Sequence, residues 1–399
     1  MHGRNWLSYS VLALVSSSIA VVLSVLLNLP ATATSDIPAA YRWDIPEWLP
    51  KPIVPASNPM SAAKVELGRS LFYEPRLSVT GDFSCASCHE QALGFTDGKT
   101  VGEGATGELH PRNSMSLTNV AYYSVLTWAN PLMRNLETQS LVPLFGEQPI
   151  EMGLGGHEQA LVAMLQSEPD YARMFATAFP DVENPVTVRH LTQAIAAFER
   201  TLISANSPYD RYRYGGEANA ISASAKRGEA LFNSERLECF HCHSGFNFSD
   251  SIAHDRLAFK EIAFHNTGLY NLDAQGSYPP DNTGVYEITE NPAQMGHFRT
   301  PTLRNIALTA PYMHDGSVAT LEEAIAHYAQ GGRTLAVGPY AGVGSANPLK
   351  STFMSGFSLT EGEKADLIAF LESLTDEEFV QNPAFSDPHL KSELTRLQQ

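Results

Sequence analysis

Cysteine and positive charge are both scarce in this sequence. Only four of the 399 residues are cysteine, which limits any disulfide framework to two bridges. Lysine and arginine total 26 against 43 aspartate and glutamate residues, so the formal net charge is −17. Because like charges repel, this balance argues against nucleic acid or anionic lipid as a partner, and its simplest role is solubility. An alternation of apolar and polar residues over strand length is also missing, which argues against an extensive β-sheet.

The first 35 residues have the pattern of an export signal. Arg4 precedes an uncharged run over 7–29, and Pro30-Ala31-Thr32-Ala33 follows as a segment that resembles a cleavage site. The run is long for a signal peptide, and about 20 apolar residues can span a bilayer. Residues 1–35 are therefore predicted to be a signal peptide or an uncleaved signal anchor. Both alternatives place the rest of the chain in the periplasm, either soluble or tethered.

The four cysteines form two copies of one motif, Cys85-Ala-Ser-Cys88-His89 and Cys239-Phe-His-Cys242-His243. Four cysteines in an exported chain first suggest two disulfides, and cysteine with histidine can also bind zinc. The C-x-x-C-H spacing, used twice and including every cysteine, instead indicates covalent haem attachment. Two thioethers would hold each haem, and the adjacent histidine would bind its iron. We therefore predict two covalently bound haem c groups.

A duplication organises the chain around these motifs. A Gly-x-x-Leu-Phe segment precedes each of them, beginning at Gly68 and again at Gly228, an offset of 160 residues. Two copies of one unit are the simplest explanation. The predicted organisation after residue 35 is a proline-rich arm over 36–60, a first haem domain over 61–215, a second haem domain over 216–380 and a tail over 381–399.

Helices are the expected secondary structure. Apolar residues recur at helical spacing over 188–202, and two capping boxes precede apolar faces, Thr320 with Glu323 and Thr360 with Glu363. The segments between helices are rich in Gly, Pro, Asn and Ser, and a buried haem can organise such loops. The expected fold class is all-α, with two cytochrome-c-like domains, each with one covalently bound haem c, linked by long loops.

A series of short motifs in a fixed order resembles the bacterial di-haem cytochrome c peroxidase and MauG superfamily over about residues 60–375. After the first CxxCH come Gln139, Pro149-Ile150-Glu151-Met152-Gly153, the second CxxCH, Phe298-Arg299-Thr300-Pro301-Thr302-Leu303-Arg304-Asn305 and Thr309-Ala310-Pro311-Tyr312-Met313-His314-Asp315-Gly316. Runs such as Asn58-Pro59-Met60-Ser61-Ala62-Ala63-Lys64 further resemble the di-haem enzymes encoded beside methanobactin genes. The resemblance implies a peroxidase-type oxidoreductase whose first haem reacts with peroxide and whose second stores electrons.

The resemblance also implies the residues around the first iron. Classical peroxidases close this iron with a histidine about sixteen residues beyond CxxCH, and here Ala105 holds that position. His110, the nearest histidine, is given a structural role, so the first iron is expected to be open without reductive activation. Gln139 and Glu151 match the family's distal pair, and Pro143 matches the apolar distal position of MauG. Glu151 would move the proton that peroxide cleavage requires, with Gln139 orienting the oxygen; a solvated loop acid is the alternative.

Tyr328 matches the position of the second ligand to the second iron. It lies fourteen residues after His314, where classical peroxidases have methionine and MauG-like enzymes have tyrosine. A phenolate favours oxidised iron and would help to store an oxidising equivalent. A core tyrosine is the alternative, because Tyr328 lies on the apolar face of its helix, and Met295 and Met313 are weaker ligand candidates.

Two further sites follow from the resemblance. Trp128 lies near the position of the tryptophan that connects the two haems, where an indole would relay electrons; a tryptophan that only packs is the alternative. Asn113, Thr309 and Pro311 match a calcium site between the domains, with one side-chain and two backbone oxygens as ligands. Two ordinary loops are the alternative there.

Three functions are open at this point. A MauG-like enzyme would use hydrogen peroxide to form a high-valent, bis-Fe(IV)-type state and would oxidise a residue, tryptophan to kynurenine, of an exported copper-binding partner protein. A di-haem peroxidase would reduce peroxide to water with electrons from a small cytochrome or cupredoxin. A non-enzymatic electron carrier would have both irons saturated. Tyr328 and Ala105 favour the first over the second, whereas Gln139 and Glu151 favour both enzymes over the third.

The haem content is directly testable. Pyridine haemochrome analysis and intact mass of the exported protein should show two covalent haems, because each motif supplies two cysteine sulfurs. Changing both cysteines of the second motif to alanine should remove one haem and leave the other. Fewer than two haems in the unaltered protein would contradict the whole assignment.

Overall fold

The computed structural model describes residues 41–390, and helices are the only elements longer than three residues in that range. The predicted export segment over 1–35 lies outside the described residues. Among the helices that are described, none combines the length and the apolar run that a bilayer crossing requires. The described residues from Arg42 onward cluster as one compact unit, which contains both CxxCH motifs.

The helices and strands leave long connecting loops. The α-helices are α2 Ala62–Phe72, α3 Leu136–Gln139, α4 Leu141–Phe145, α5 Glu158–Ser167, α6 Pro169–Ala178, α7 Val188–Glu199, α8 Pro208–Arg213, α9 Ala223–Phe232, α10 Tyr286–Thr289, α11 Leu321–Ala329, α12 Glu361–Glu372 and α13 Glu377–Gln381. Four strands of two residues form two antiparallel pairs, β1 Phe264–His265 with β2 Phe298–Arg299 and β3 Thr334–Leu335 with β4 Gly342–Val343. The sequence predicted α7, α11 and α12 among these helices, together with the long loops, whereas the strands are too short to give a periodic signal.

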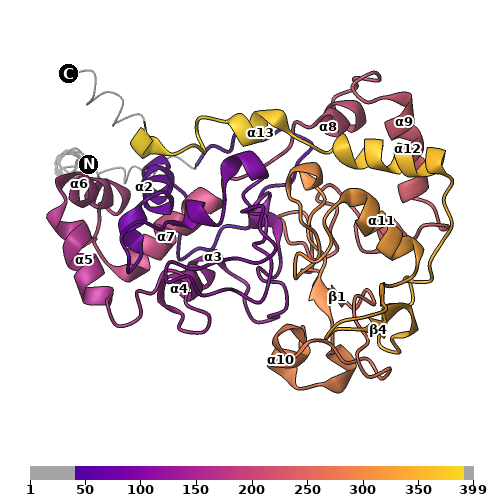
Figure 1. Cartoon of the computed structure of the whole chain (residues 1–399). Coiled ribbons are helices and arrows are strands. Elements are labelled where there is room, and N and C mark those ends of the chain that lie inside the picture. The colour runs from indigo at the N-terminus through magenta and orange to yellow at the C-terminus, as the bar shows by residue number, and fades with distance from the viewer. Residues whose placement is uncertain (1–40, 391–399) are drawn as a thin grey trace, which may run out of the picture. The chain divides into compact units, whose positions relative to one another are not determined.

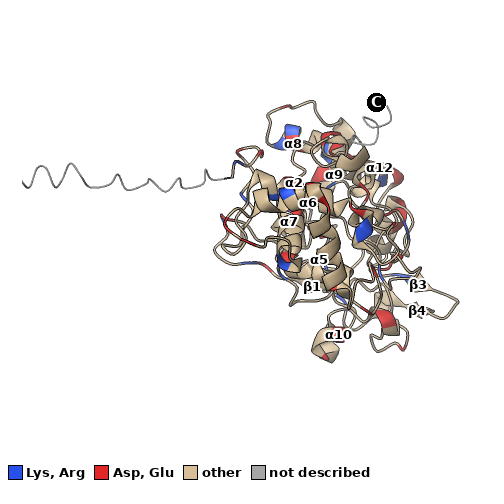
Figure 2. Ribbon diagram, turned by 90° about the vertical axis from the view of Figure 1, so that its left-hand side faces the viewer, with Lys and Arg blue, Asp and Glu red and all other residues tan. Residues whose placement is uncertain are grey.

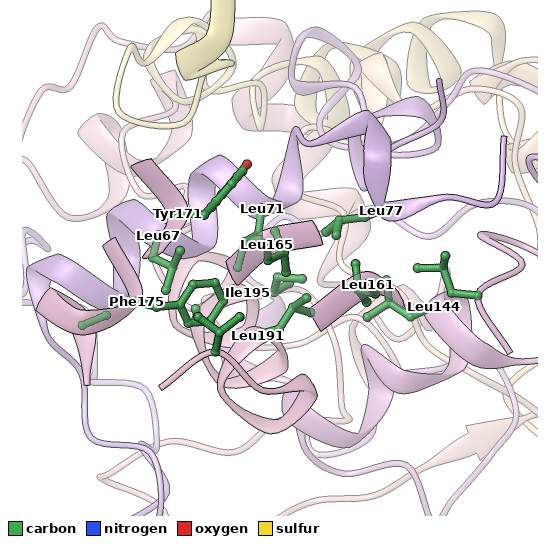
Figure 3. Packing of buried hydrophobic residues seen from close by; sticks show 14 of the residues in the cluster. Leu67, Leu71, Leu77, Leu144, Leu161, Leu165, Tyr171, Phe175, Leu191 and Ile195 are labelled. Carbon is green, nitrogen blue, oxygen red and sulfur yellow. The ribbon is translucent and has the colours of Figure 1, made fainter. Parts of the chain in front are cut away.

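The duplication appears as two similar halves, the first from α2 to α7 and the second from α9 to α12 (Figure 1). In the first half, apolar side chains of α2, α5, α6 and α7 pack together, among them Leu67, Leu71, Leu165, Phe175 and Ile195 (Figure 3). A separate cluster in the second half joins α9 to α12. Each half thus buries its own apolar side chains, as expected for a repeated unit.

Each half depends on a close crossing of two helices at a glycine. A Cβ atom on Gly68 of α2 would lie 1.9 Å from the carbonyl oxygen of Ala194 in α7. A Cβ atom on Gly228 of α9 would lie 2.0 Å from the carbonyl oxygen of Asp366 in α12. Since no side chain fits at either point, the Gly-x-x-Leu-Phe segments are repeated because both crossings need a residue without a side chain.

The capping predictions are confirmed for α12 and half confirmed for α11. Thr360 and Glu363 bond reciprocally at the start of α12. At α11 the Thr320 hydroxyl accepts from the Glu323 amide, but the Glu323 carboxylate accepts from the amide of Ala319 instead of that of Thr320. The predicted helix over 188–202 ends earlier, at Glu199.

Both ends of the described chain pack against the two halves. In the proline-rich arm Leu49 is buried, and the Arg256 side chain donates to the carbonyl oxygens of 47, 48 and 49. After α12 the chain returns to the first half (Figure 1), where Phe379 and Phe385 pack against Phe72 and Phe95. Contacts therefore run across the predicted domain boundaries at 215 and 380. The two boundaries stay predictions.

The glycine crossing predicts a stability effect. Gly228→Ala should lower the free energy of unfolding of the haem-loaded protein by about 1–3 kcal/mol or more, because the new methyl group must push α9 from α12. Gly362→Ala is the matched control in α12, since nothing lies within 4 Å of a Cβ atom there. The control should be neutral or stabilising by up to about 1 kcal/mol. Equal denaturant midpoints for the two variants would contradict the crossing.

Candidate active site

The first CxxCH motif forms a single 3-10 turn, Cys85–Ser87, at the wall of a cavity. His89, which also lines this cavity, has its Nδ1 atom 2.9 Å from the carbonyl oxygen of Phe95. A carbonyl oxygen accepts only, so Nδ1 carries the proton and Nε2 is left as the metal-binding nitrogen. Burial lowers the pKa of His89, which keeps the ring neutral as ligation requires.

The second motif repeats this arrangement at a second cavity. The Nδ1 atom of His243 lies 2.9 Å from the carbonyl oxygen of Phe248, and burial again lowers the pKa of the ring. Phe95 and Phe248 both have left-handed backbone, with φ of 62° and 49°. Such a conformation is uncommon for a bulky residue. Both are buried, so packing holds each phenylalanine where its carbonyl group faces the histidine.

The four cysteines fit haem attachment better than disulfide formation. None of them is in a disulfide, although all lie within the described residues. Burial raises the pKa of the Cys88 and Cys239 thiols to about 12 each, so both are protonated and lack reactive thiolate character. The second cavity is lined mainly by apolar side chains such as Phe232, Leu367 and Leu371. Two sulfurs, one free imidazole nitrogen and an apolar cavity are what a haem c group requires.

Gln139 and Glu151 lie far from His89 in the sequence but line the same cavity. Gln139 ends α3, and Pro143, in α4, lines the cavity beside it. Burial raises the pKa of Glu151 to about 7. A carboxyl group with that pKa can both accept and return a proton near neutral pH. Glu151 is half-buried in the cavity wall, and its catalytic role stays a prediction.

The comparisons with known proteins agree with this geometry. The family model for di-haem cytochrome c peroxidase matches residues 62–219. The methylamine utilization protein MauG of Methylorubrum extorquens is 36% identical over 87% of this chain and 89% of its own. The cytochrome c551 peroxidase of Nitrosomonas europaea is 34% identical over 69% of this chain and 76% of its own. The chain belongs to the di-haem cytochrome c peroxidase and MauG family. It is therefore an oxidoreductase that acts on peroxide, and the family implies two haem c groups.

Solved structures also resemble this family member. A MauG-like protein associated with microbial copper homeostasis is 49% identical, with a TM-score of 0.86, over 88% of this chain and all of the other. The di-haem peroxidase BthA of Burkholderia thailandensis is 22% identical, with a TM-score of 0.63, over 83% of this chain and 91% of its own, and shows a shared fold.

Tyr328 of this di-haem protein lies in the second cavity with His243. It is a half-buried residue of α11, and burial raises the pKa of its phenol. A nearby cation would be needed to offset that rise and give a phenolate. Of the weaker candidates, Met313 lines the same cavity, whereas Met295 is not among its lining residues.

Trp128 lines both haem cavities. Its Nε1 atom donates to the carbonyl oxygen of Asn113 at 2.9 Å, and its own carbonyl oxygen accepts from the Arg299 amide at 2.8 Å. The Arg299 guanidinium packs over the ring of Tyr123 at 3.7 Å. The indole is therefore held between the two sites by residues from both halves of the chain.

Asn113, Thr309 and Pro311 surround a third, smaller cavity that Trp128 also lines. The Asn113 amide nitrogen donates to the carbonyl oxygen of Lys99, which leaves its side-chain oxygen as the available ligand. The structure thus brings the three calcium candidates together from distant parts of the sequence. The same cavity is lined by Arg299 and Arg304, whose charges would oppose a cation.

Two residues of the first cavity had no assigned chemistry. His110 was predicted to be only structural, but it lines this cavity, and its Nε2 atom lies 4.0 Å from a carboxylate oxygen of Glu151. Glu199 of α7 also lines it, with one oxygen that has no hydrogen-bond partner, and burial raises its pKa to about 8. Glu199 is an acidic residue in a helix whose buried residues are mostly apolar. This isolated acid is the sequence feature that could have identified Glu199 as a candidate site residue.

Tyr328 can be tested without disturbing the packing. Tyr328→Phe should change the low-spin spectrum of the second haem and raise its reduction potential, because a hard anionic ligand is lost. Tyr312→Phe is the matched control, since Tyr312 lines the same cavity but donates to the carbonyl oxygen of Ile306. A spectrum unchanged in Tyr328→Phe would reject ligation.

Proposed function

We propose that this family member is a MauG-like enzyme that uses hydrogen peroxide to oxidise a residue of another protein. The observation that supports this most is the shared cavity of His89, Gln139 and Glu151, joined through Trp128 to a second cavity with His243 and Tyr328. The haem pair, when bound, supplies the redox chemistry of peroxide. An electron carrier would have no need of a distal carboxyl group with a pKa of about 7.

In the proposed mechanism the protein's own residues bind peroxide and move its proton. Glu151 takes a proton from the inner oxygen of peroxide and returns it to the outer oxygen, which leaves as water. Gln139 orients the bound oxygen by hydrogen bonding. The Ala105 amide donates to the carbonyl oxygen of Glu151 at 2.7 Å. Ala105, which stands where classical peroxidases have a histidine ligand, therefore helps to hold the loop that carries Glu151. Trp128 then carries electrons between the two sites.

The proposed substrate is a tryptophan of an exported copper-binding protein, converted to kynurenine in the periplasm. The similarity to a MauG-like protein associated with copper homeostasis supports a copper-related partner. Tryptophan plus two molecules of peroxide gives N-formylkynurenine and two of water, so four electrons pass from the indole to peroxide. Hydrolysis then releases formate and leaves kynurenine. In this proposal the electrons travel from the indole through the enzyme to the haem sites, with Trp128 between them.

Mixing the fully oxidised enzyme with peroxide tests this function. Stopped-flow spectra should change without added reductant, and mass spectrometry of a candidate partner from a neighbouring gene should show the tryptophan oxidised. A reaction that needs prior one-electron reduction, with rapid consumption of a reduced small cytochrome or cupredoxin, would favour the detoxifying peroxidase. An enzyme inert to peroxide in both states would favour the electron carrier.

The raised pKa of Glu151 gives this reaction a characteristic pH profile. The carboxylate form accepts the proton, so the rate with peroxide should rise from pH 6 and level off above pH 8, around the pKa of about 7. Glu151→Gln should lower the rate by about 10²–10⁴-fold and remove the pH dependence. Glu147→Gln, an exposed residue of the same loop, is the control and should react like the unaltered enzyme. A full rate in Glu151→Gln would exclude the proposed role.

We also propose that Asn113, Thr309 and Pro311 bind Ca²⁺ between the two haem sites, because these oxygens are hard ligands. Treatment with a strong chelator should then slow electron transfer between the haems, and added Ca²⁺ should restore it. Elemental analysis that finds no calcium in the purified protein would count against the site.

A further inference from the structure

Three tyrosines form a continuous series from the second haem cavity to the surface. Tyr278 is buried and lines the cavity beside Phe298 and His314. The ring centroids of Tyr278 and Tyr270 are 5.5 Å apart, and those of Tyr270 and Tyr340 are 5.7 Å apart, both in edge-to-face geometry. Tyr270 is buried, whereas Tyr340 is 43% exposed. Adjacent rings at such spacing are close enough for electrons to pass by short steps.

The first two tyrosines are held firmly and have hydrogen-bond acceptors. The Tyr278 hydroxyl donates to the side-chain oxygen of Asn266 at 2.8 Å. Gly296, at φ 71°, makes room for its ring, because a Cβ atom there would lie 2.1 Å from the ring. The Tyr270 hydroxyl donates to a carboxylate oxygen of Asp315 at 2.6 Å. A phenol releases its proton when it is oxidised, and the Asp315 carboxylate can take the proton of Tyr270, whereas the Asn266 amide only accepts the hydrogen bond of Tyr278.

Charge near Tyr270 makes this acceptor important. The Arg333 guanidinium lies over the Tyr270 ring at 4.7 Å and would oppose any positive charge formed there. When the phenolic proton passes to Asp315 as the electron leaves, the ring becomes a neutral radical and this repulsion is avoided. The hydrogen bond and the cation together favour oxidation coupled to proton transfer.

Tyr340 lies where a protein could contact it. It belongs to the loop of the β3–β4 hairpin, which projects at one edge of the ribbon (Figure 2). Val337 in this loop is 84% exposed and Val343 of β4 is 47% exposed. Exposed apolar side chains grouped around an aromatic residue are typical of protein contact surfaces.

We propose that Tyr278, Tyr270 and Tyr340 carry oxidising equivalents from the second haem cavity to a protein substrate docked on the β3–β4 hairpin. This inference rests on the proposed function, in which peroxide is the oxidant. For each equivalent, one electron moves from the substrate's aromatic side chain to Tyr340, then to Tyr270, then to Tyr278 and the haem pair. On oxidation Tyr270 passes its proton to Asp315 and the exposed Tyr340 passes its proton to water, and each regains the proton when it is reduced. Tyr278, whose partner Asn266 is no base, keeps its proton in the hydrogen bond and is occupied only in passing. Two such transfers reduce one peroxide to water.

The test is to locate oxidation in the fully oxidised holoenzyme treated with peroxide and a nitroso spin trap, without substrate. Peptide mass spectrometry should find trap adducts at Tyr340. In Tyr270→Phe these adducts should fall by about tenfold or more, because phenylalanine raises the barrier to the intermediate step, tenfold per 1.36 kcal/mol. The rate of peroxide consumption in the first turnover should be unchanged, since Tyr270 does not line the first cavity. Circular dichroism and the haem spectrum check that the variant is folded.

Tyr214→Phe is the matched control. Tyr214 is 40% exposed but stacks on Trp48 and lines neither haem cavity, so adducts at Tyr340 should persist in this variant. If peroxide is consumed and Tyr340 is labelled equally in Tyr270→Phe, or if Tyr214 is the main labelled site, the tyrosine series is overturned and the proposed function stands. If the oxidised enzyme consumes no peroxide, both fall together.

Discussion

The close crossing of two helices at a glycine is the constraint on which each haem site depends. At Gly68 and Gly228 the backbone of one helix touches that of another, so no larger residue can occupy either position. The crossing fixes the helix that leads into the CxxCH turn relative to the helix that closes the half. Each motif is therefore presented at a defined place, although little regular structure surrounds it. Long loops then follow, and their positions are set by buried polar contacts.

The most constrained of these contacts is the buried pair of Arg304 and Asp210. Both side chains are almost fully inaccessible, and two guanidinium nitrogens lie 2.7 and 2.9 Å from the carboxylate oxygens. Arg304 also donates to the carbonyl oxygen of Phe246, in the loop that follows the second CxxCH. A buried charge that lost its partner would be costly, so this pair ties α8 and the loop to one arrangement. Arg299, from the same sequence motif, holds the Trp128 loop.

The two cavities differ in the side chains that line them. The first presents Gln139 and the carboxyl group of Glu151, with a second buried acid, Glu199, on another wall. The second presents Tyr328 and apolar side chains, with tyrosines leading away from it. One site is thus suited to proton transfer with a small molecule, and the other to electron transfer over distance.

The sequence by itself determined the haem-binding motifs, the duplication and the helices α7, α11 and α12, because these are local patterns of spacing and periodicity. The family motifs also named Gln139, Glu151 and Trp128, which the structure brings to shared cavities. Only the tertiary structure placed His110 next to Glu151 and Glu199 in the same cavity, gave Phe95 and Phe248 their left-handed backbone, and aligned the three tyrosines. Burial, which raises the pKa of Glu151, and ring spacing both depend on contacts between distant segments. No local pattern encodes such contacts, since loop residues far apart in the chain meet only when both halves have folded.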